Sequence, residues 1–179
     1  MPLTYTDSFA LVNLALCAIK HTNKTMYFQT GTEASFEPVT STGTRTELRV
    51  KNTIHAVNKT EDIVTGYTVT LKDAKFSPEI IAVLDGGKLT KDTKLSYTAA
   101  LAGAPVARMP FTLEIYTEVK QGNTVTGYLK FSVPGCVGTP FKPTIKDGEF
   151  AAMDYTMSSE APSGEPPLSF EELTELPAT

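Results

Sequence analysis

The most constraining stretch of this sequence spans residues 61–87, where a strand pattern runs into a short helix with clear end signals. Residues 67–72 alternate apolar and polar side chains, the period-two pattern of a strand with one buried face. Residues 77–79 (Ser-Pro-Glu) favour a helix start, with Ser as N-cap, Pro at the first position and an acidic side chain beside the positive helix end. The glycines at 86–87 can take the left-handed conformation that ends a helix. Because about two helical turns are unstable alone, we expect this helix to pack against a sheet.

The composition favours a β-rich domain with a substantial core. Of the 179 residues, 41% are hydrophobic and 20% are charged, with nine Phe, seven Tyr and no Trp. This balance is typical of a globular chain, and the abundance of Thr and Val favours strands. We expect residues 1–179 to form a single domain, with a long loop at about 22–46 and an acidic segment from about residue 160.

The charges are unevenly distributed along the chain. The formal net charge is −4, and all sixteen Lys and Arg precede Asp147, whereas eight acidic residues lie from Asp147 onward. The acidic end has two interpretations: a solvated tail, or a surface that repels a polyanion. A net negative chain without a basic strip does not have the charge pattern of a nucleic-acid reader.

The two cysteines and the N-terminal apolar run bear on the compartment. Cys17 and Cys136 fit no metal or redox spacing, so we expect two buried thiols. Residues 9–20 are apolar on both faces, which leaves two alternatives: a strand buried on both sides, which we prefer, or a helix capped by Asp7 or Ser8. The run is too short to span a bilayer and lacks signal-peptide flanks, so we expect synthesis in a reducing cytosol.

Further strands follow from period-two patterns between irregular stretches. Residues 48–56 predict a strand that joins the opening one through a turn at 58–62. Residues 22–46 and 85–110 show little periodicity and predict irregular structure. A loop as long as 22–46 is uncommon in a compact domain unless it has a function or becomes ordered against a partner.

The clearest hairpin covers residues 111–133. Two alternating runs flank the turn residues 121–123 (Gln-Gly-Asn), and Pro134-Gly135 is expected to end the second strand. One face of this hairpin is apolar and the other carries hydroxyls and charges. Beyond it, residues 149–158 predict a strand, and 168–176 either a last strand or a short acidic helix. Six or seven strands with one helix predict a sandwich or barrel with the helix against one sheet.

No constellation of residues supports catalysis. His21 and His55 are the only histidines and stand in no metal-ligand spacing, and no Gly-x-Ser-x-Gly elbow is present. Residues 85–89 hold two glycines and a lysine but follow a helix, whereas a phosphate-binding loop precedes one. The adjacent acids at 61–62 and 171–172 are typical of solvated segments. We therefore predict no enzyme and no catalytic, cofactor-binding or metal-binding residues.

Three stretches, through their order and spacing, carry a resemblance to a known family. The first joins Leu48-Arg49-Val50-Lys51-Asn52 to residues 58–63 (NKTEDI) and continues to Gly87; the second is 108–118 (RMPFTLEIYTE); the third combines 131–140 (FSVPGCVGTP), 146–150 (KDGEF) and 162–167 (PSGEPP). Over roughly residues 46–176, the chain resembles the major tail (tail tube) proteins of long-tailed bacteriophages and prophages of Gram-positive bacteria.

The resemblance implies a mainly β tail tube fold: a two-sheet antiparallel sandwich or open barrel with one short flanking helix. Such subunits form stacked hexameric rings whose inner sheets join into one barrel around a channel. Double-stranded DNA passes through this channel without specific binding. The implied partners are further copies and other tail proteins, with no cofactor and no membrane. The implied location is the virion tail, after assembly in the cytoplasm of the bacterial host.

Two alternatives remain beside this interpretation, and one residue assignment depends on it. The chain could be the tube subunit of a phage-derived contractile bacteriocin-like particle, which a neighbouring sheath gene would distinguish. It could also be an immunoglobulin-like binding module, for which an exposed aromatic patch near Tyr27-Phe28 would be expected. Because tail tubes typically have acidic lumens, Glu114 and Glu118 on the charged face of the 111–133 hairpin are candidates to line the channel.

Overall fold

The computed structural model describes residues 10–22 and 24–178 and is mainly β. In chain order the elements of this part are β1 (Ala10–His21), β2 (Lys24–Phe28), β3 (Gly31–Ser41), β4 (Arg45–Val50), β5 (Thr53–Lys59), β6 (Ile63–Asp73), α1 (Pro78–Asp85), β7 (Lys88–Lys91), β8 (Leu95–Thr98), β9 (Phe111–Gln121), β10 (Thr124–Gly138), β11 (Met153–Ser159) and β12 (Ser169–Leu173). The strand alternative for residues 9–20 is therefore confirmed from residue 10 onward, but the expected burial on both sides holds only for residues 16–19, since residues 10–13 are exposed. The helix caps considered at Asp7 and Ser8 lie outside the described residues.

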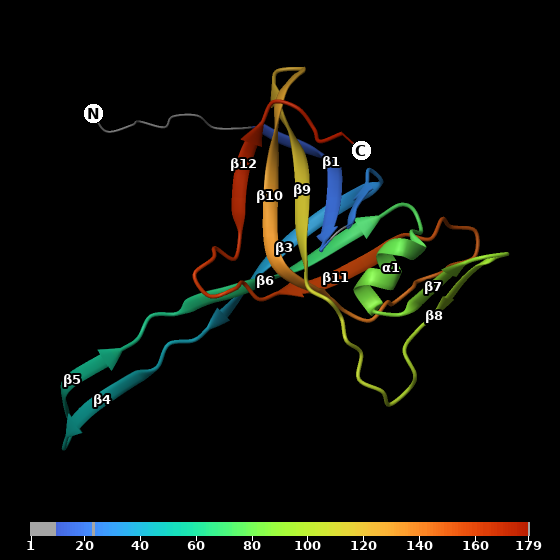
Figure 1. Cartoon of the computed structure of the whole chain (residues 1–179). Helices are drawn as coiled ribbons and strands as arrows, with labels where there is room; N and C mark the ends of the chain where they lie inside the picture. Colours follow the sequence, from blue (N-terminus) through green and yellow to red (C-terminus); the bar gives the residue numbers. More distant parts are fainter. Residues whose placement is uncertain (1–9, 23, 179) are drawn as a thin grey trace.

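Eight strands form one antiparallel sheet, and it bends within β10. The strand order is β2-β1-β9-β10-β11-β6-β3, with β12 added to β10. The first part of β10 pairs with β9 on one edge and β12 on the other, whereas its last residues, 136–138, pair with β11. In Figure 1, β12, β10, β9 and β1 stand upright and β3, β6 and β11 cross them. We call β2, β1, β9, the first part of β10, and β12 the upright part of the sheet.

The prediction that Pro134-Gly135 ends the second hairpin strand is wrong. β10 continues to Gly138 across a register shift between Val133 and Cys136, where Gly135 has φ 65°. Such a bulge accommodates a proline without an N–H and bends the strand. The Gly135 carbonyl accepts a hydrogen bond from the Glu160 N–H at 3.3 Å, which ties the bend to the end of β11.

One hydrophobic core joins both parts of the sheet to the helix. Its buried members include Cys17, Ile19, Val69, Leu71, Ile80, Ile81, Leu84, Leu113, Ile115, Val133, Cys136 and Met157. The helix prediction is confirmed: Ser77 is extended at the N-cap, Pro78 begins the helix, and Gly86 at φ 76° ends it. The Gly86 N–H donates to the Ala82 carbonyl at 3.1 Å.

Both cysteines are buried and free, as expected. Burial raises the pKa of Cys17 and of Cys136 to about 12, and for Cys17 the charge of Asp73 acts in the same direction. These thiols therefore behave as small apolar side chains of the core.

The prediction of a long loop at residues 22–46 is wrong. This stretch contains β2, β3 and the beginning of β4, and β3 pairs with β6 from Gly31 to Ser41. Most side chains of β3 are exposed, because it is the last strand of the sheet path. An edge strand of this kind lacks the clear alternation of apolar residues that signals a half-buried strand. The expected irregular region 85–110 likewise contains the β7–β8 hairpin.

The remaining predicted strands differ from the observed ones mainly in their boundaries. Residues 48–56 form no single strand; they belong to the β4–β5 hairpin, which turns at residues 51–52, with Lys51 at φ 55°. The strand expected at 149–158 begins later, at Met153. Of the two alternatives for 168–176, the strand is the one found, as β12.

Candidate functional site

The described residues form no cluster suited to metal ligation. No group of three or more His, Cys, Asp or Glu in residues 10–22 and 24–178 is placed to hold a metal ion. His21 lies at the end of β1 and His55 lies on β5, so the two histidines belong to different sheets. The adjacent acids at 61–62 and 171–172 are all exposed, as expected, and Asp62 accepts a hydrogen bond from the Gly43 N–H at 2.8 Å.

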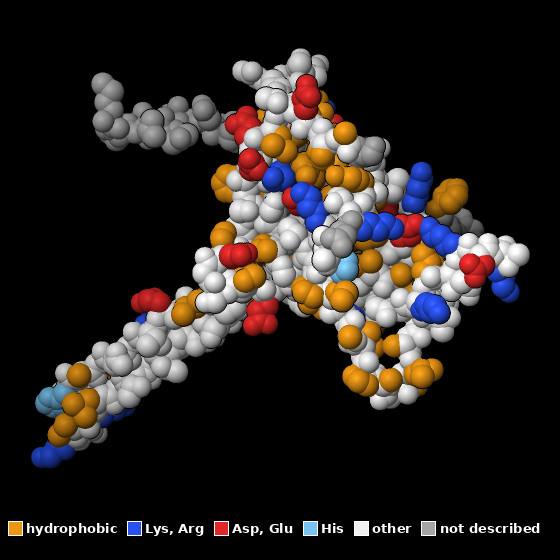
Figure 2. All heavy atoms as spheres, viewed as in Figure 1, with side chains coloured by type: hydrophobic (Ala, Val, Ile, Leu, Met, Phe, Trp, Pro, Cys, Tyr) orange, Lys and Arg blue, Asp and Glu red, His pale blue; other side chains and the backbone are white. Residues whose placement is uncertain are grey.

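The most extensive polar cluster lies on the face of the upright sheet that points away from the main core. We call it the polar face, and its charged and phenolic members are Lys20, Glu114, Tyr116, Glu118, Lys120, Lys130 and Glu171. Strand register places them on one side: Lys130 is opposite both Tyr116 on β9 and Glu171 on β12. Figure 2 shows basic, acidic and apolar side chains interspersed over the upright strands.

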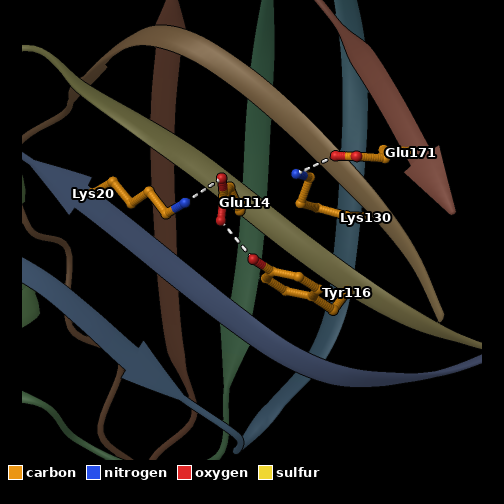
Figure 3. Close-up of polar contacts among 5 residues, drawn as sticks. All are labelled: Lys20, Glu114, Tyr116, Lys130 and Glu171. Carbon is orange, nitrogen blue, oxygen red and sulfur yellow. Dashed lines mark hydrogen bonds and ion pairs between the residues drawn. The ribbon is translucent and has the colours of Figure 1, made fainter. Parts of the chain in front are cut away.

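At the centre of the polar face, Glu114 is almost completely enclosed. Its side chain accepts a hydrogen bond from Lys20 Nζ at 2.7 Å and one from the Tyr116 hydroxyl at 2.5 Å (Figure 3). Only 5% of Glu114 is exposed, so it is not the solvated acid that the sequence pattern suggests. Burial, together with the hydrogen bond to Glu114, raises the pKa of Tyr116 well above its usual range.

A small apolar cluster covers the same region and explains this burial. Leu16, Ala18 and Tyr116 are buried against one another, and Tyr27, Leu173 and Leu176 pack on them. Because Leu176 follows β12, the acidic C-terminal segment crosses the polar face. Tyr27 packs on this intramolecular cluster, and Phe28 lies in the main core. These two residues therefore do not form the exposed aromatic patch that an immunoglobulin-like binding module would require.

Two further ion pairs complete the polar face. Lys130 Nζ lies 2.5 Å from Glu171 Oε2 (Figure 3), and Lys120 Nζ lies 3.3 Å from Glu118 Oε2. The hydrogen bond from Lys130 lowers the pKa of Glu171, and hydrogen bonds from Asn13 and then Lys120 lower the pKa of Glu118. Every lysine of β1, β9, β10 and β12 thus has a carboxylate partner, and these strands contain no arginine.

A second surface is the projecting hairpin, which we call the arm and define as residues 42–62. The arm extends far from the rest of the fold (Figure 1), and β4 and β5 pair only with each other among the described strands. Its apolar side chains Leu48, Val50, Ile54 and Val57 are 45–59% exposed. Figure 2 shows apolar side chains along the arm and basic ones near its end.

The arm has the character of a contact surface. A two-stranded ribbon is only marginally stable in water, and contiguous exposed apolar residues mark interaction sites. Arg45 and Arg49 share a single carboxylate, Glu47, each at 2.8 Å, so positive charge exceeds negative charge on β4. The sequence carried a signal for this hairpin that the strand prediction overlooked: the two-residue break at 51–52 between alternating runs.

Comparisons with known proteins add no family assignment, since no family model and no curated protein matches the chain. Within the described part of the chain, no helix is long and apolar enough to cross a membrane.

Proposed function

We propose that this chain is a virion structural protein, the subunit of a bacteriophage tail tube that polymerises as stacked hexameric rings around a channel for double-stranded DNA. Three features support the proposal: the antiparallel sheet bent into two parts that share a core, the short helix α1 against that core, and the sequence resemblance. The arm is the observation that carries it, because an exposed apolar ribbon needs a neighbour to cover it.

The free energy gained by covering the arm is too small to hold a dimer, but it can add to other contacts in a larger assembly. Its four half-exposed apolar side chains would each contribute about 1 kcal/mol when covered, or about 4 kcal/mol in all. Association of two molecules costs about 4–15 kcal/mol, so one docked arm does not hold a dimer. A closed ring has one more interface than an open chain of the same number of subunits. Because this extra interface stabilises the closed ring, we expect complete rings to appear over a narrow range of protein concentration, with few partial assemblies.

The two edges of the upright part of the sheet are a second surface through which copies of the chain could associate. β2 and β12 are its two outer strands, and each pairs on only one side among the described residues. Unpaired edges bind further strands, and edges at opposite ends of one sheet suit head-to-tail association that closes into a ring. In such a ring, the upright sheets of neighbouring copies would form one continuous barrel.

The test measures assembly of the purified protein as concentration increases. Sedimentation velocity and negative-stain electron microscopy should show hexameric rings or tubes for the wild type. The double variant Leu48→Glu with Ile54→Glu should remain monomeric, because it places charge on the arm. The control variant Leu101→Glu changes a leucine that is 80% exposed, in the 99–110 loop away from the arm, and should still assemble. A wild-type protein that stays monomeric at every concentration would refute the proposal.

A further inference from the structure

We propose that a cavity between the β2–β3 turn and the start of α1 binds a primary ammonium group, from a small amine or from a lysine side chain. The cavity has a volume of about 450 Å³, and its walls come from residues 27–30 and from residues 73 and 75–77. It includes no member of the polar face or of the arm, so binding there does not depend on ring assembly.

The wall of this cavity contains a buried carboxylate without a cation. Asp73, the last residue of β6, is only 1% exposed. It accepts hydrogen bonds from the Thr30 hydroxyl and from the Lys75 backbone N–H, both at Oδ1. Within the described part of the chain, no lysine or arginine side chain forms an ion pair with it. Because a charge removed from water is unfavourable unless it is paired, a cationic ligand would compensate this carboxylate.

Two buried side chains close to Asp73 are affected by its negative charge. Burial, and to a smaller extent the charge of Asp73, raises the pKa of Cys17 and of Tyr155 to about 12, while the Ser77 backbone lowers that of Tyr155. The Tyr155 hydroxyl is itself buried and has no hydrogen-bond partner among the described residues. The region behind the cavity thus contains a negative charge and an unused hydroxyl, and neither is matched by a protein cation.

The other groups around the cavity suit an ammonium group. Ser77 is the N-cap of α1, but its side chain makes no capping hydrogen bond, so its oxygen can accept one from an ammonium group. Phe76 is 57% exposed and presents an aromatic ring, which attracts cations. One carboxylate falls short of the about six to eight oxygen ligands that Ca²⁺ requires. Since the positive end of α1 and the nearby Lys75 oppose a further positive charge, we expect millimolar affinity.

Equilibrium dialysis of the full chain against labelled putrescine, at physiological ionic strength, measures this binding. Dialysis works with free and with assembled protein, so its result is separate from that of the assembly test. Asp73→Asn keeps the shape of the side chain and removes its charge, whereas Phe76→Leu removes the ring and keeps the carboxylate. The control, Asp92→Asn, removes an exposed acid in the β7–β8 turn, with the same change in net charge as Asp73→Asn.

The wild type should bind a single putrescine per chain, and n-butylamine or acetyl-lysine methylamide should displace it, whereas n-butanol, which has no charge, should not. Asp73→Asn should weaken binding by about tenfold or more and Phe76→Leu by about two- to fivefold, while Asp92→Asn should leave it unchanged. Stronger displacement by acetyl-lysine methylamide than by n-butylamine would identify a lysine side chain as the ligand, and equal or weaker displacement a free amine.

Three results would overturn the ammonium site: no saturable binding by the wild type, displacement by n-butanol, or equal binding by the wild type and Phe76→Leu. Equal binding by a folded Asp73→Asn variant would do the same. Circular dichroism shows whether Asp73→Asn folds, and if it does not, Phe76→Leu decides the outcome, because its exposed ring can be removed without opening the core.

Discussion

Glu79, in the first turn of α1, connects the helix to two strands. It accepts hydrogen bonds from Lys24 Nζ on β2, at 2.9 Å, and from Lys91 on β7. These contacts lower the pKa of Glu79 to about 2, with the bond from Lys91 as the larger cause. Replacing Glu79 by Gln keeps the size of the side chain and removes its charge, so the variant isolates the electrostatic part of the connection.

Three considerations determine how much stability Glu79→Gln should remove. For a group shielded from water, the lowered pKa would correspond to about 3 kcal/mol of stability. The side chain of Glu79 is 37% exposed, however, and solvent screening reduces two such pairs to about 1 kcal/mol. The acidic group also lies at the positive end of the helix, which contributes about 0.3–1 kcal/mol. We therefore expect Glu79→Gln to lower the free energy of unfolding by about 1–2 kcal/mol at neutral pH.

The stabilisation that Glu79 provides should depend on pH in one direction only. Because the pKa is lowered in the folded state, the stabilisation is fully present above the unfolded-state pKa of about 4.3. It is lost as the pH falls through the folded-state value of about 2. The difference between wild type and variant should therefore be constant from pH 6 to 8 and become smaller at pH 3.

Urea denaturation at pH 7, 5 and 3 measures this difference directly. Glu33→Gln is the matched control, since Glu33 pairs with one lysine, Lys72, on an exposed strand pair and lies at no helix end. The control should cost less than about 0.5 kcal/mol at each pH. If Glu79→Gln costs no more than the control, or if its cost is undiminished at pH 3, the two-lysine connection does not stabilise the fold.

Three further predictions concern packing, the thiols and the last strand. A Cβ on Gly138 would lie 2.4 Å from Leu84 Cα, so Gly138→Ala should displace α1 and lower the free energy of unfolding in urea by about 2–3 kcal/mol. The thiols of Cys17 and Cys136, with pKa raised to about 12 by burial, should not react with a thiol reagent at pH 8 until urea unfolds the protein. Removing residues 168–179 should uncover Leu16 and Tyr116 and lower stability by about 2–3 kcal/mol, measured by thermal unfolding.

The parts of the fold that the sequence predicts well are those specified by nearby residues. The helix at 78–85 has its N-cap, its proline and its terminating glycine within ten residues, and the 111–133 hairpin has its turn between its two strands. β3 has no such local signal. Its partner β6 begins more than twenty residues later, and its exposed side chains produce no alternation, so its strand character depends on a tertiary contact.

For the polar face, too, the sequence predicts the features that depend on neighbouring residues and misses those that depend on distant ones. Glu114 and Glu118 could be placed on one face of β9 from the alternation alone, and the structure has them there. The burial of Glu114 could not be predicted, because its partner Lys20 lies 94 residues away in sequence. The pair forms only through the β1–β9 register, which shifts twice between Val12 and Leu16. No local pattern encodes such irregularities.

The Lys130–Glu171 pair connects β12 to β10 across the polar face. Glu171 belongs to β12, so the same contact neutralises a lysine of the polar face and fixes the strand that forms the outer edge of the upright sheet. A subunit whose β12 detached would lose that edge and expose a free ammonium group together with the Leu16 and Tyr116 cluster. In the proposed ring, this ion pair would therefore help to hold the strand through which neighbouring subunits join.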